Sequence, residues 1–386
     1  MDRSEWPTEN PRVLHLATVP FRPEEGVSRA VTDLSANMID VDSHLAADRP
    51  VGDGFAGLHA LTDWRPHVLA LSPRLAHVVA EVRPSLVHLH GGILATSLAL
   101  LPALRGVPVV ATVYQLLPVP RHELGWHQIL DARHSSVRPA RVAASAAFGL
   151  PIARRLLKSG RIRVICTPDP RVAAALNAHG RVVMARGGAS VSALRATWSD
   201  TPTIVFAGRA EPGRGVEELI AAFTIVRARI PGARLRLLLL PGPAGERWRA
   251  EHGRRPGIDL VVGTQPDLSA QFAACQVAAL PFRIPATITP PLVAAEAMAA
   301  GLPVVATGLS CITPMLRHGV NGAIADDLAP VALADALISV IGQRANWERL
   351  SSGARRTIES DWSWLGAARS TREAYRYALR VGDGRR

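Results

Sequence analysis

The sequence predicts an α/β protein built from two doubly wound domains, each with a parallel sheet, that face each other across a cleft. Short apolar runs of strand type alternate along the chain with segments whose apolar residues recur at helical spacing. This alternation is typical of β-α-β units with right-handed crossovers, which form parallel sheets. The chain has 386 residues, more than one ordinary core accommodates, so we expect two domains of roughly 150 to 200 residues each.

A run of small residues, Gly187-Gly188-Ala189-Ser190, is typical of a linker and marks the expected domain boundary. We therefore assign residues 1–188 to the first domain and residues 189–365 to the second. Residues 366–386 are expected to form a C-terminal helix that packs back on the first domain.

The composition is that of a globular protein, with 48% hydrophobic and 20% charged residues. The formal charge of +12 comes almost wholly from arginine, because Lys158 is the single lysine. Such a charge attracts anions, which include nucleotide diphosphates, anionic lipids and nucleic acid. No helix-turn-helix, zinc-finger or aromatic sheet signature is present and aromatic residues are only 5%, so we expect no nucleic-acid partner.

The N-terminus is polar and lacks the apolar core of a secretory signal, and no apolar run reaches the ~18 residues that a spanning helix needs. We therefore expect a cytoplasmic protein. The basic run from Arg154 to Arg163 is interleaved with leucines, which fits either a solvated helix face or a helix on the inner face of the membrane. Cys166, Cys275 and Cys311 lack the spacing of a zinc site or a disulfide framework and are expected to be buried.

The first strand is expected at Arg12 to Thr18, followed by a loop that ends at Gly26 and by a helix. A strand, a glycine-bearing loop and a helix can aim backbone N–H groups at a phosphate, although the three-glycine dinucleotide fingerprint is absent. Further strands are expected at Ser85 to His90 and Val107 to Val113, with a helix at Ile93 to Leu104 between them.

His88 and His90 have the i, i+2 spacing that places both side chains on one face of a strand. Two histidines could bind a metal, but no third ligand is evident in the sequence, so we predict no metal site. His90, at the strand end, is expected to line a site or anchor a loop. The irregular segment from Leu116 to Arg138 is expected to be a binding loop or a lid. Elements that complete the domain are expected at Arg161 to Thr167, Asp169 to His179 and Arg181 to Met184.

The second domain is expected to begin with a strand at Thr203 to Ala207, a loop at Gly208 to Gly215 and a helix at Val216 to Arg229. The loop carries Arg209 and Arg214 next to a helix N-terminus, whose dipole also favours negative charge. Two guanidinium groups in this place form a plausible diphosphate clamp. The alternative is that both arginines form ordinary surface salt bridges.

The stretch from Pro290 to Thr307 predicts a short helix and a buried strand. Two prolines can open the helix, and Gly301 can close it in the left-handed conformation. Glu296 lies in the middle of this apolar helix and either faces solvent or binds a ligand hydroxyl at the mouth of the sheet. The other expected elements are Arg234 to Leu240, Ile258 to Val262, Leu268 to Ala274, Val277 to Leu280, Ala329 to Ile341, Ala345 to Glu359 and Trp362 to Leu379.

Three motifs follow one another along the second half: the Gly208–Gly215 loop, the Glu296–Val305 run and the Gly319–Gly322 turn. In this order they resemble the family 4 (group 1) glycosyltransferases of the GT-B fold. The first strand and loop, Val13 to Gly26, and the strand-helix-strand from Val87 to Thr112 fit the same family. The resemblance covers nearly the whole length of the chain.

The resemblance implies two Rossmann-like domains, the first binding the acceptor and the second the nucleotide sugar. It implies transfer of a sugar from a nucleotide-diphosphate sugar, usually with retention, with no required metal and no cofactor beyond this co-substrate. Arg209 and Arg214 would then hold the diphosphate and stabilise it as it leaves, Glu296 would bind the ribose, and the Gly26 loop would approach the donor or acceptor. The expected donor-binding residues are Gly26, Arg209, Arg214, Pro291, Leu292 and Glu296.

The sequence departs from the family pattern at several positions. A second glutamate usually lies eight residues before Glu296, where this chain has Ile288, and Tyr114 stands where the family often has a histidine. The usual lysine of the phosphate loop is Arg214, and Ser310 to Pro314 replace the usual Gly-Gly-Ile-Pro-Glu loop. The alternative hypothesis is therefore a catalytically impaired homologue that acts as a nucleotide-binding or partner subunit. The acceptor is expected to be a small molecule, a saccharide or a lipid-linked molecule.

Overall fold

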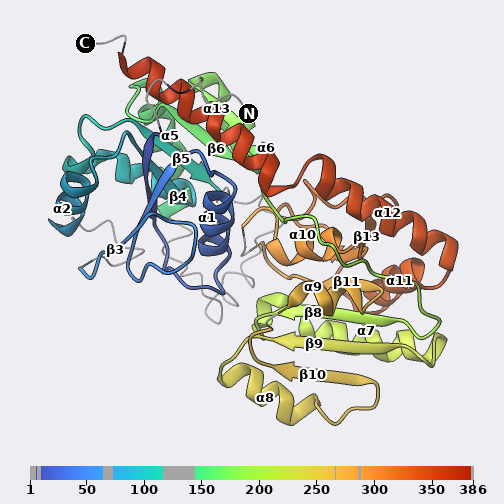
Figure 1. Cartoon of the computed structure of the whole chain (residues 1–386). Helices are drawn as coiled ribbons and strands as arrows, with labels where there is room; N and C mark the ends of the chain where they lie inside the picture. The colour runs from blue at the N-terminus through green and yellow to red at the C-terminus, as the bar shows by residue number, and fades with distance from the viewer. Residues whose placement is uncertain are drawn as a thin grey trace. The chain divides into compact units, whose positions relative to one another are not determined.

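The structure is a computed structural model, and it describes Trp6 and residues 10–63, 73–115, 144–265, 267–285 and 288–383. The chain forms two compact units (Figure 1). Unit 1 comprises the described residues up to Gly187 and the C-terminal helix that begins at Trp364, and unit 2 comprises Gly188–Ser363. The predicted lid from 116 to 138 lies outside the described residues.

Unit 1 is built on a parallel sheet of seven strands in the order β3-β2-β1-β4-β5-β6-β7. The strands are β1 Arg12–Ala17, β2 Asp42–Ala47, β3 Gly57–Ala60, β4 Leu86–Gly91, β5 Val109–Val113, β6 Val164–Thr167 and β7 Val182–Met184. The order runs outward from β1 in one direction and then from β4 in the other. The topological switch point, where such sheets bind ligands, therefore lies between β1 and β4.

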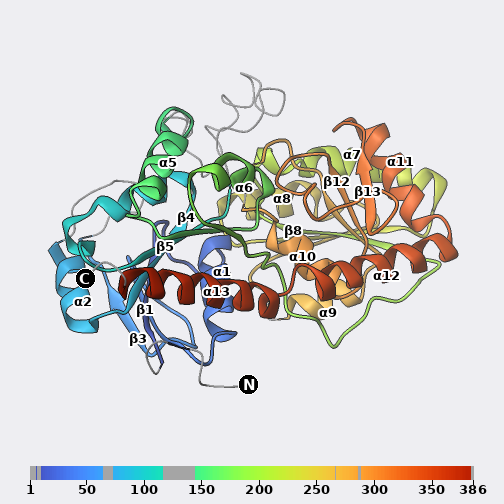
Figure 2. The same ribbon diagram turned by 90° about the horizontal axis from the view of Figure 1, so that it is seen from above.

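Helices cover both faces of this sheet. The described helices of unit 1 are α1 Gly26–Ala36, α2 Pro73–Val82, α5 Leu150–Lys158, α6 Pro170–Leu176 and α13 Trp364–Asp383. One face carries leucines and valines of β1, β4 and β5, which form a core cluster with buried residues of α2, α5 and α6. The long helix α13 lies beside α1 on the other face and contacts β4, β5, β6 and β7 (Figure 2).

Unit 2 has a parallel sheet of six strands in the order β10-β9-β8-β11-β12-β13. The strands are β8 Thr203–Gly208, β9 Arg234–Leu239, β10 Ile258–Val262, β11 Val277–Leu280, β12 Val304–Thr307 and β13 Gly322–Ala325. Its switch point lies between β8 and β11. The predicted doubly wound α/β architecture is therefore confirmed in both units.

The helices of unit 2 are α7 Val216–Arg229, α8 Pro243–His252, α9 Leu268–Ala273, α10 Leu292–Ala299, α11 Pro330–Ile341 and α12 Arg344–Ser360. Helices α7 and α11 pack together, whereas α10 contacts α9 and α12 on the opposite face of the sheet (Figure 2). The core between these layers is one cluster of buried aliphatic and aromatic side chains.

Several elements differ from the sequence-based prediction. Strands β2, β3 and β13 and helices α2 and α8 were not expected. The edge strands β3 and β13 have only four residues each, β2 begins with polar residues, and α8 carries mostly polar and charged residues. The predicted single helix from Ile93 to Leu104 is instead two 3-10 helices, Ile93–Leu100 and Pro102–Leu104. Pro102 lacks the N–H group that a continuous helix would need at this position.

Within the described residues, no helix is long and apolar enough to span a membrane. Cys166, Cys275 and Cys311 are all buried and unpaired with one another, as the sequence predicted. Burial in an apolar environment raises the pKa of the Cys166 thiol to about 12, so this residue behaves as a small hydrophobic side chain.

Candidate active site

The predicted diphosphate loop follows β8 directly, at the carboxyl edge of the unit 2 sheet. Arg209 is the first residue after the strand, and Arg214 ends a short 3-10 turn, Pro212–Arg214, that leads into α7. Both arginines are partly exposed. The predicted helix Val216–Arg229 is confirmed as α7, so a helix N-terminus with its positive dipole end begins one residue after Gly215.

The loop has a conformation that only glycine adopts easily at its last residue. Gly215 has φ +67°, and a Cβ atom built on it would lie 1.8 Å from the carbonyl oxygen of Pro281. Two loops therefore meet without any side chain between them. They are the loop after β8 and the loop after β11, which are neighbouring strands on either side of the switch point.

Two residues of the second loop support the first, and the sequence did not indicate either of them. The guanidinium of Arg214 lies 4.8 Å from the centre of the Phe282 ring, which is a cation–π contact. Arg283 donates its backbone N–H to the carbonyl oxygen of Gly213 (3.0 Å), and its side chain forms an ion pair with Glu218 in the first turn of α7. Arg283 thereby adds a third guanidinium beside the loop that carries Arg209.

Helix α10 starts at the same edge of the sheet, because it follows β11. Pro291 precedes its first residue, Leu292. Both side chains are buried and uncharged, so only their backbone could contact a charged ligand. Glu296 lies in the second turn and is partly buried. The predicted closure by Gly301 fits its φ of +73°. Residues after β8 and residues after β11 thus flank one switch point, where the principle of doubly wound sheets places the ligand.

Two further positions belong to this edge. Ile288 lies in the loop that leads to α10 and is partly exposed. Thr307 lies at the end of β12, and its hydroxyl group donates a hydrogen bond to the carbonyl oxygen of Phe282 (2.6 Å). This bond ties the loop after β11 to the neighbouring strand β12.

In unit 1, Gly26 is the first residue of α1 and is partly exposed. The loop before it is held by side chains. The backbone N–H of Arg22 donates to Ser28 Oγ (3.0 Å), and the backbone N–H of Phe21 donates to Asp48 Oδ1 (2.8 Å). This loop leaves β1, next to the switch point of the unit 1 sheet. Gly26 therefore follows the carboxyl end of β1, on the side of the unit 1 sheet where a ligand is expected.

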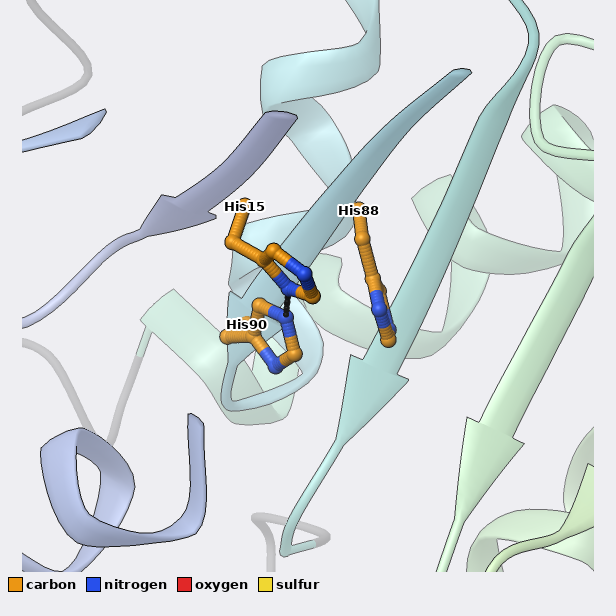
Figure 3. A group of neighbouring side chains, drawn as sticks. All are labelled: His15, His88 and His90. Carbon is orange, nitrogen blue, oxygen red and sulfur yellow. Dashed lines mark hydrogen bonds between the residues drawn. The ribbon is translucent and has the colours of Figure 1, made fainter. Parts of the chain in front are cut away.

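His88 and His90 do share one face of β4, as predicted, and the structure adds a third imidazole that was not evident in the sequence. His15 of β1 lies beside them, since residues 15 and 88 are direct partners in the register of the two strands (Figure 3). Each of the three imidazoles offers one ring nitrogen, and these three nitrogens lie within 4.8 Å of one another. The separation of about 75 residues in sequence hid this neighbour from sequence analysis.

The three imidazoles are part of a buried hydrogen-bond network. His15 Nδ1 and His90 Nε2 are 3.0 Å apart, and His90 Nδ1 is 3.0 Å from the hydroxyl of Tyr114. His88 Nδ1 is 2.6 Å from the hydroxyl of Tyr375 on α13, and His88 Nε2 is 2.7 Å from Thr112 Oγ1. The C-terminal helix is thereby joined to the centre of the unit 1 sheet.

Burial controls the charge of this network. Loss of solvent lowers the pKa of His15 to about 3 and holds the pKa values of His88 and His90 well below the usual value, and repulsion from neighbouring histidines acts in the same direction. Burial also raises the pKa values of Tyr114 and Tyr375. All five groups are therefore neutral at pH 7.

Asp40 and Asp42 each form an ion pair within unit 1. Asp40 binds Arg372 of α13 (2.6 Å), and Asp42 binds Arg12 of β1 (2.7 Å).

A comparison with known families matches residues 201–343 to the family model described as Glycosyl transferases group 1. This segment lies within unit 2 and contains the loop after β8 and helix α10.

Two curated relatives are D-inositol 3-phosphate glycosyltransferases. The protein of Nocardioides sp. is 32% identical over 197 residues, which are 46% of this chain and 42% of that protein. The protein of Catenulispora acidiphila is 26% identical over 322 residues, which are 78% of this chain and 73% of that protein. The chain thus spans less than half the length of the first of these relatives.

Solved structures share the fold over nearly the whole chain. Sucrose-phosphate synthase from Thermosynechococcus elongatus has a TM-score of 0.73 at 18% identity, covering 96% of this chain and 100% of that one. Alr3699/HepE of Anabaena, in complex with UDP-glucose, has a TM-score of 0.70 at 16% identity, covering 95% and 99%. Together with the two parallel sheets, these matches support the resemblance stated from the sequence: residues 201–343 match the model of the group 1 glycosyltransferase family, and the chain has the GT-B fold.

Proposed function

We propose that this protein is a glycosyltransferase that moves a sugar from a nucleotide-diphosphate sugar to an acceptor, with retention and without a metal ion in the chemical step. The observation that carries the proposal is the arrangement at the switch point of unit 2. There, a loop with Arg209 and Arg214 follows β8, and the start of α10 follows the neighbouring strand β11.

This arrangement suits the chemistry of a leaving diphosphate. When the glycosidic bond breaks, negative charge develops on phosphate oxygens, and fixed cations stabilise it as it forms. Arg209 and Arg214 would supply two guanidinium groups, and the N-termini of α7 and α10 would add backbone N–H groups with a favourable dipole. Glu296, one turn into α10, would accept hydrogen bonds from the ribose hydroxyls.

The comparisons suggest which substrates to test first. The Anabaena protein HepE has been solved with UDP and with UDP-glucose, so a uridine diphosphate sugar is our first donor. The names of the curated relatives suggest D-inositol 3-phosphate as the first acceptor. Saccharide and lipid-linked acceptors complete the panel.

The test is calorimetric binding of UDP, GDP and dTDP, followed by turnover assays with the matching sugars. Loss of a charged hydrogen-bond partner costs about 1.5–3 kcal/mol, so Arg214→Ala should weaken diphosphate binding by roughly ten- to a hundredfold. Arg214→Lys should retain part of the binding, because it keeps the charge but not the fork of donors. Arg234→Ala is the matched control. Arg234 is an exposed arginine at the first residue of β9, so it lies at the amino ends of the strands, whereas the proposed clamp lies at their carboxyl ends. Equal affinity of Arg214→Ala and Arg234→Ala would refute the proposed clamp.

A second candidate function is nucleotide binding without turnover, and two residues favour it. Ile288 cannot hydrogen-bond a sugar hydroxyl, and the hydroxyl of Tyr114 lies inside the unit 1 network, 3.0 Å from His90. Binding of a nucleotide without transfer or hydrolysis across the whole panel would support this candidate. Ile288→Glu then becomes the informative variant, because a gain of turnover would show that the missing carboxylate alone limits the reaction.

A further inference from the structure

Unit 1 contains a group of buried histidines that the proposed transfer reaction does not use. His15, His88 and His90 are each 0% exposed. They form the one group of three or more metal-ligating side chains in the part of the chain that the structure describes. We propose that this group is a structural site for one divalent transition-metal ion, with Zn²⁺ as the first candidate.

The geometry is close to that of a tetrahedral ion. Zn–N bonds of 2.0–2.1 Å place two ligand nitrogens about 3.3 Å apart. His15 Nδ1 and His90 Nε2 are already 3.0 Å apart, and the third imidazole, His88, lies within 4.8 Å (Figure 3). For the third nitrogen to reach an ion, the His88 ring has to turn, because both of its nitrogens now contact hydroxyl groups.

The type of side chain also suits a transition metal. Imidazole binds a metal through the lone pair of its neutral form. Imidazole ligands without thiolates favour zinc, copper, nickel or iron over magnesium or calcium.

Hydroxyl groups contact two of the histidines, as the hydrogen-bond partners of metal-binding imidazoles do. Tyr114 contacts His90 Nδ1, Tyr375 contacts His88 Nδ1, and Thr112 contacts His88 Nε2. Such partners fix the orientation of an imidazole whose other nitrogen binds the ion. When an ion is bound, one of the two hydroxyl contacts of His88 is exchanged for a metal–nitrogen bond.

One atom shows that the network is incomplete by itself. His15 Nε2 is buried and has no hydrogen-bond partner among the described residues. Leaving a buried polar nitrogen without a partner is unfavourable, because it has lost its hydrogen bonds to water. An ion bound through Nε2 would give this nitrogen a partner, whereas an ion bound through Nδ1, which now faces His90, would not.

The position of the group indicates a structural role. The site joins β1 to β4, which flank the switch point of unit 1, and the hydroxyl of Tyr375 connects it to α13. Since the three side chains are not exposed, an ion there would be closed to substrate. The ion would hold in place the two strands from which the Gly26 loop and the Gly91-Gly92 turn depart.

The competing possibility is a neutral hydrogen-bond network with no ion, and metal analysis separates the two. The full chain, produced without a polyhistidine tag in zinc-supplemented cells, is passed over a chelating resin and analysed by elemental mass spectrometry. We expect about one zinc ion per chain. Far less than one ion per chain, together with no rise in melting temperature on addition of Zn²⁺, would overturn the proposal.

Two variants locate the ion. His15→Gln should reduce the zinc content to near zero, whereas His59→Gln should leave it unchanged. His59 is the matched control because it forms the other histidine pair of unit 1, with His44 at the sheet edge (3.1 Å). Zinc that is lost in His59→Gln but kept in His15→Gln would place the ion at the edge pair and overturn the proposal.

A measurement on the unmodified chain covers the case in which His15→Gln fails to fold. Replacement of zinc by Co²⁺ should produce the visible absorption of a four-coordinate site, and X-ray absorption should show nitrogen or oxygen neighbours without sulfur. A cobalt spectrum typical of the hydrated ion would refute the site. Neither readout depends on transferase activity, so the failure of this inference is distinguishable from a failure of the proposed function.

Discussion

Gly215→Ala tests whether the contact between the two loops builds the proposed diphosphate site. Gly215 has φ +67°, and a Cβ on it would lie 1.8 Å from the carbonyl oxygen of Pro281. Gly319 offers a matched control in the same unit. Its φ is +72°, and no described heavy atom lies within 4 Å of the position that its Cβ would take.

The expected magnitudes differ because only one of the two sites is crowded. Each variant places an L-residue in the left-handed region, which costs about 1–2 kcal/mol. Real Cβ atoms essentially never come within 3.0 Å of such a neighbour, so Gly215→Ala also forces one loop away from the other by about 1 Å. Overpacking of this kind costs about 1–3 kcal/mol more. We expect a total loss of about 2–5 kcal/mol for Gly215→Ala and about 1–2 kcal/mol for Gly319→Ala.

The assay combines urea unfolding, which gives the free energy of unfolding, with calorimetric titration of the folded variants with UDP. Displacement of the loop after β8 should weaken nucleotide binding by about tenfold or more, since a misplaced charged hydrogen bond loses at least about 1.5 kcal/mol. Gly319→Ala should bind UDP as the unmodified chain does. Equal destabilisation of the two variants, with unchanged UDP affinity in Gly215→Ala, would refute the reasoning.

Three further predictions concern unit 1. Tyr375→Phe leaves a buried nitrogen of His88 without its partner and should lower the free energy of unfolding by about 1–3 kcal/mol in urea melts, whereas Tyr377→Phe, on the exposed side of α13, should be near neutral. Below pH 6.5 the unfolded chain binds protons that buried His15, with its pKa of about 3, does not bind. Stability should therefore fall as the pH drops from about 6.5 toward 3, and a flat profile over this range would contradict the burial. Burial would raise the pKa of Asp40, but the hydrogen bond and charge of Arg372 outweigh it and lower the pKa. The stability from this pair is therefore complete at neutral pH and lost as the pH falls through the folded-state pKa, and Asp40→Asn should remove that part of the acid sensitivity.

Local sequence signals were sufficient for most of unit 2. The helix that begins after Gly215 and the helix closed by Gly301 were predicted with the correct bounds to within two residues, because glycine and proline mark turns through their own backbone preferences. The strands Val277–Leu280 and Ile258–Val262 were predicted as they stand, since short apolar runs between such signals have few alternatives.

The elements that were missed depend on their neighbours. Strand β13 is recognisable only through its pairing with β12, and β2 and β3 only through pairing beside β1. Arg283 carries no local signal, because its contacts with the loop after β8 arise where two connections meet at one sheet edge. Strand pairing and loop contact are properties of the packed sheet, and periodicity along the chain does not report them.

By itself, the sequence determined the two doubly wound domains, the family resemblance and the positions of Arg209, Arg214 and Glu296 relative to their strands. These features follow from the periodicity of apolar residues and from glycine and proline positions, which are encoded locally. Only the tertiary structure decided that His15 meets His88 and His90, because strand order places β1 beside β4 although about 75 residues separate them. It likewise decided that Tyr375 of the last helix reaches this group, a contact between residues 287 positions apart.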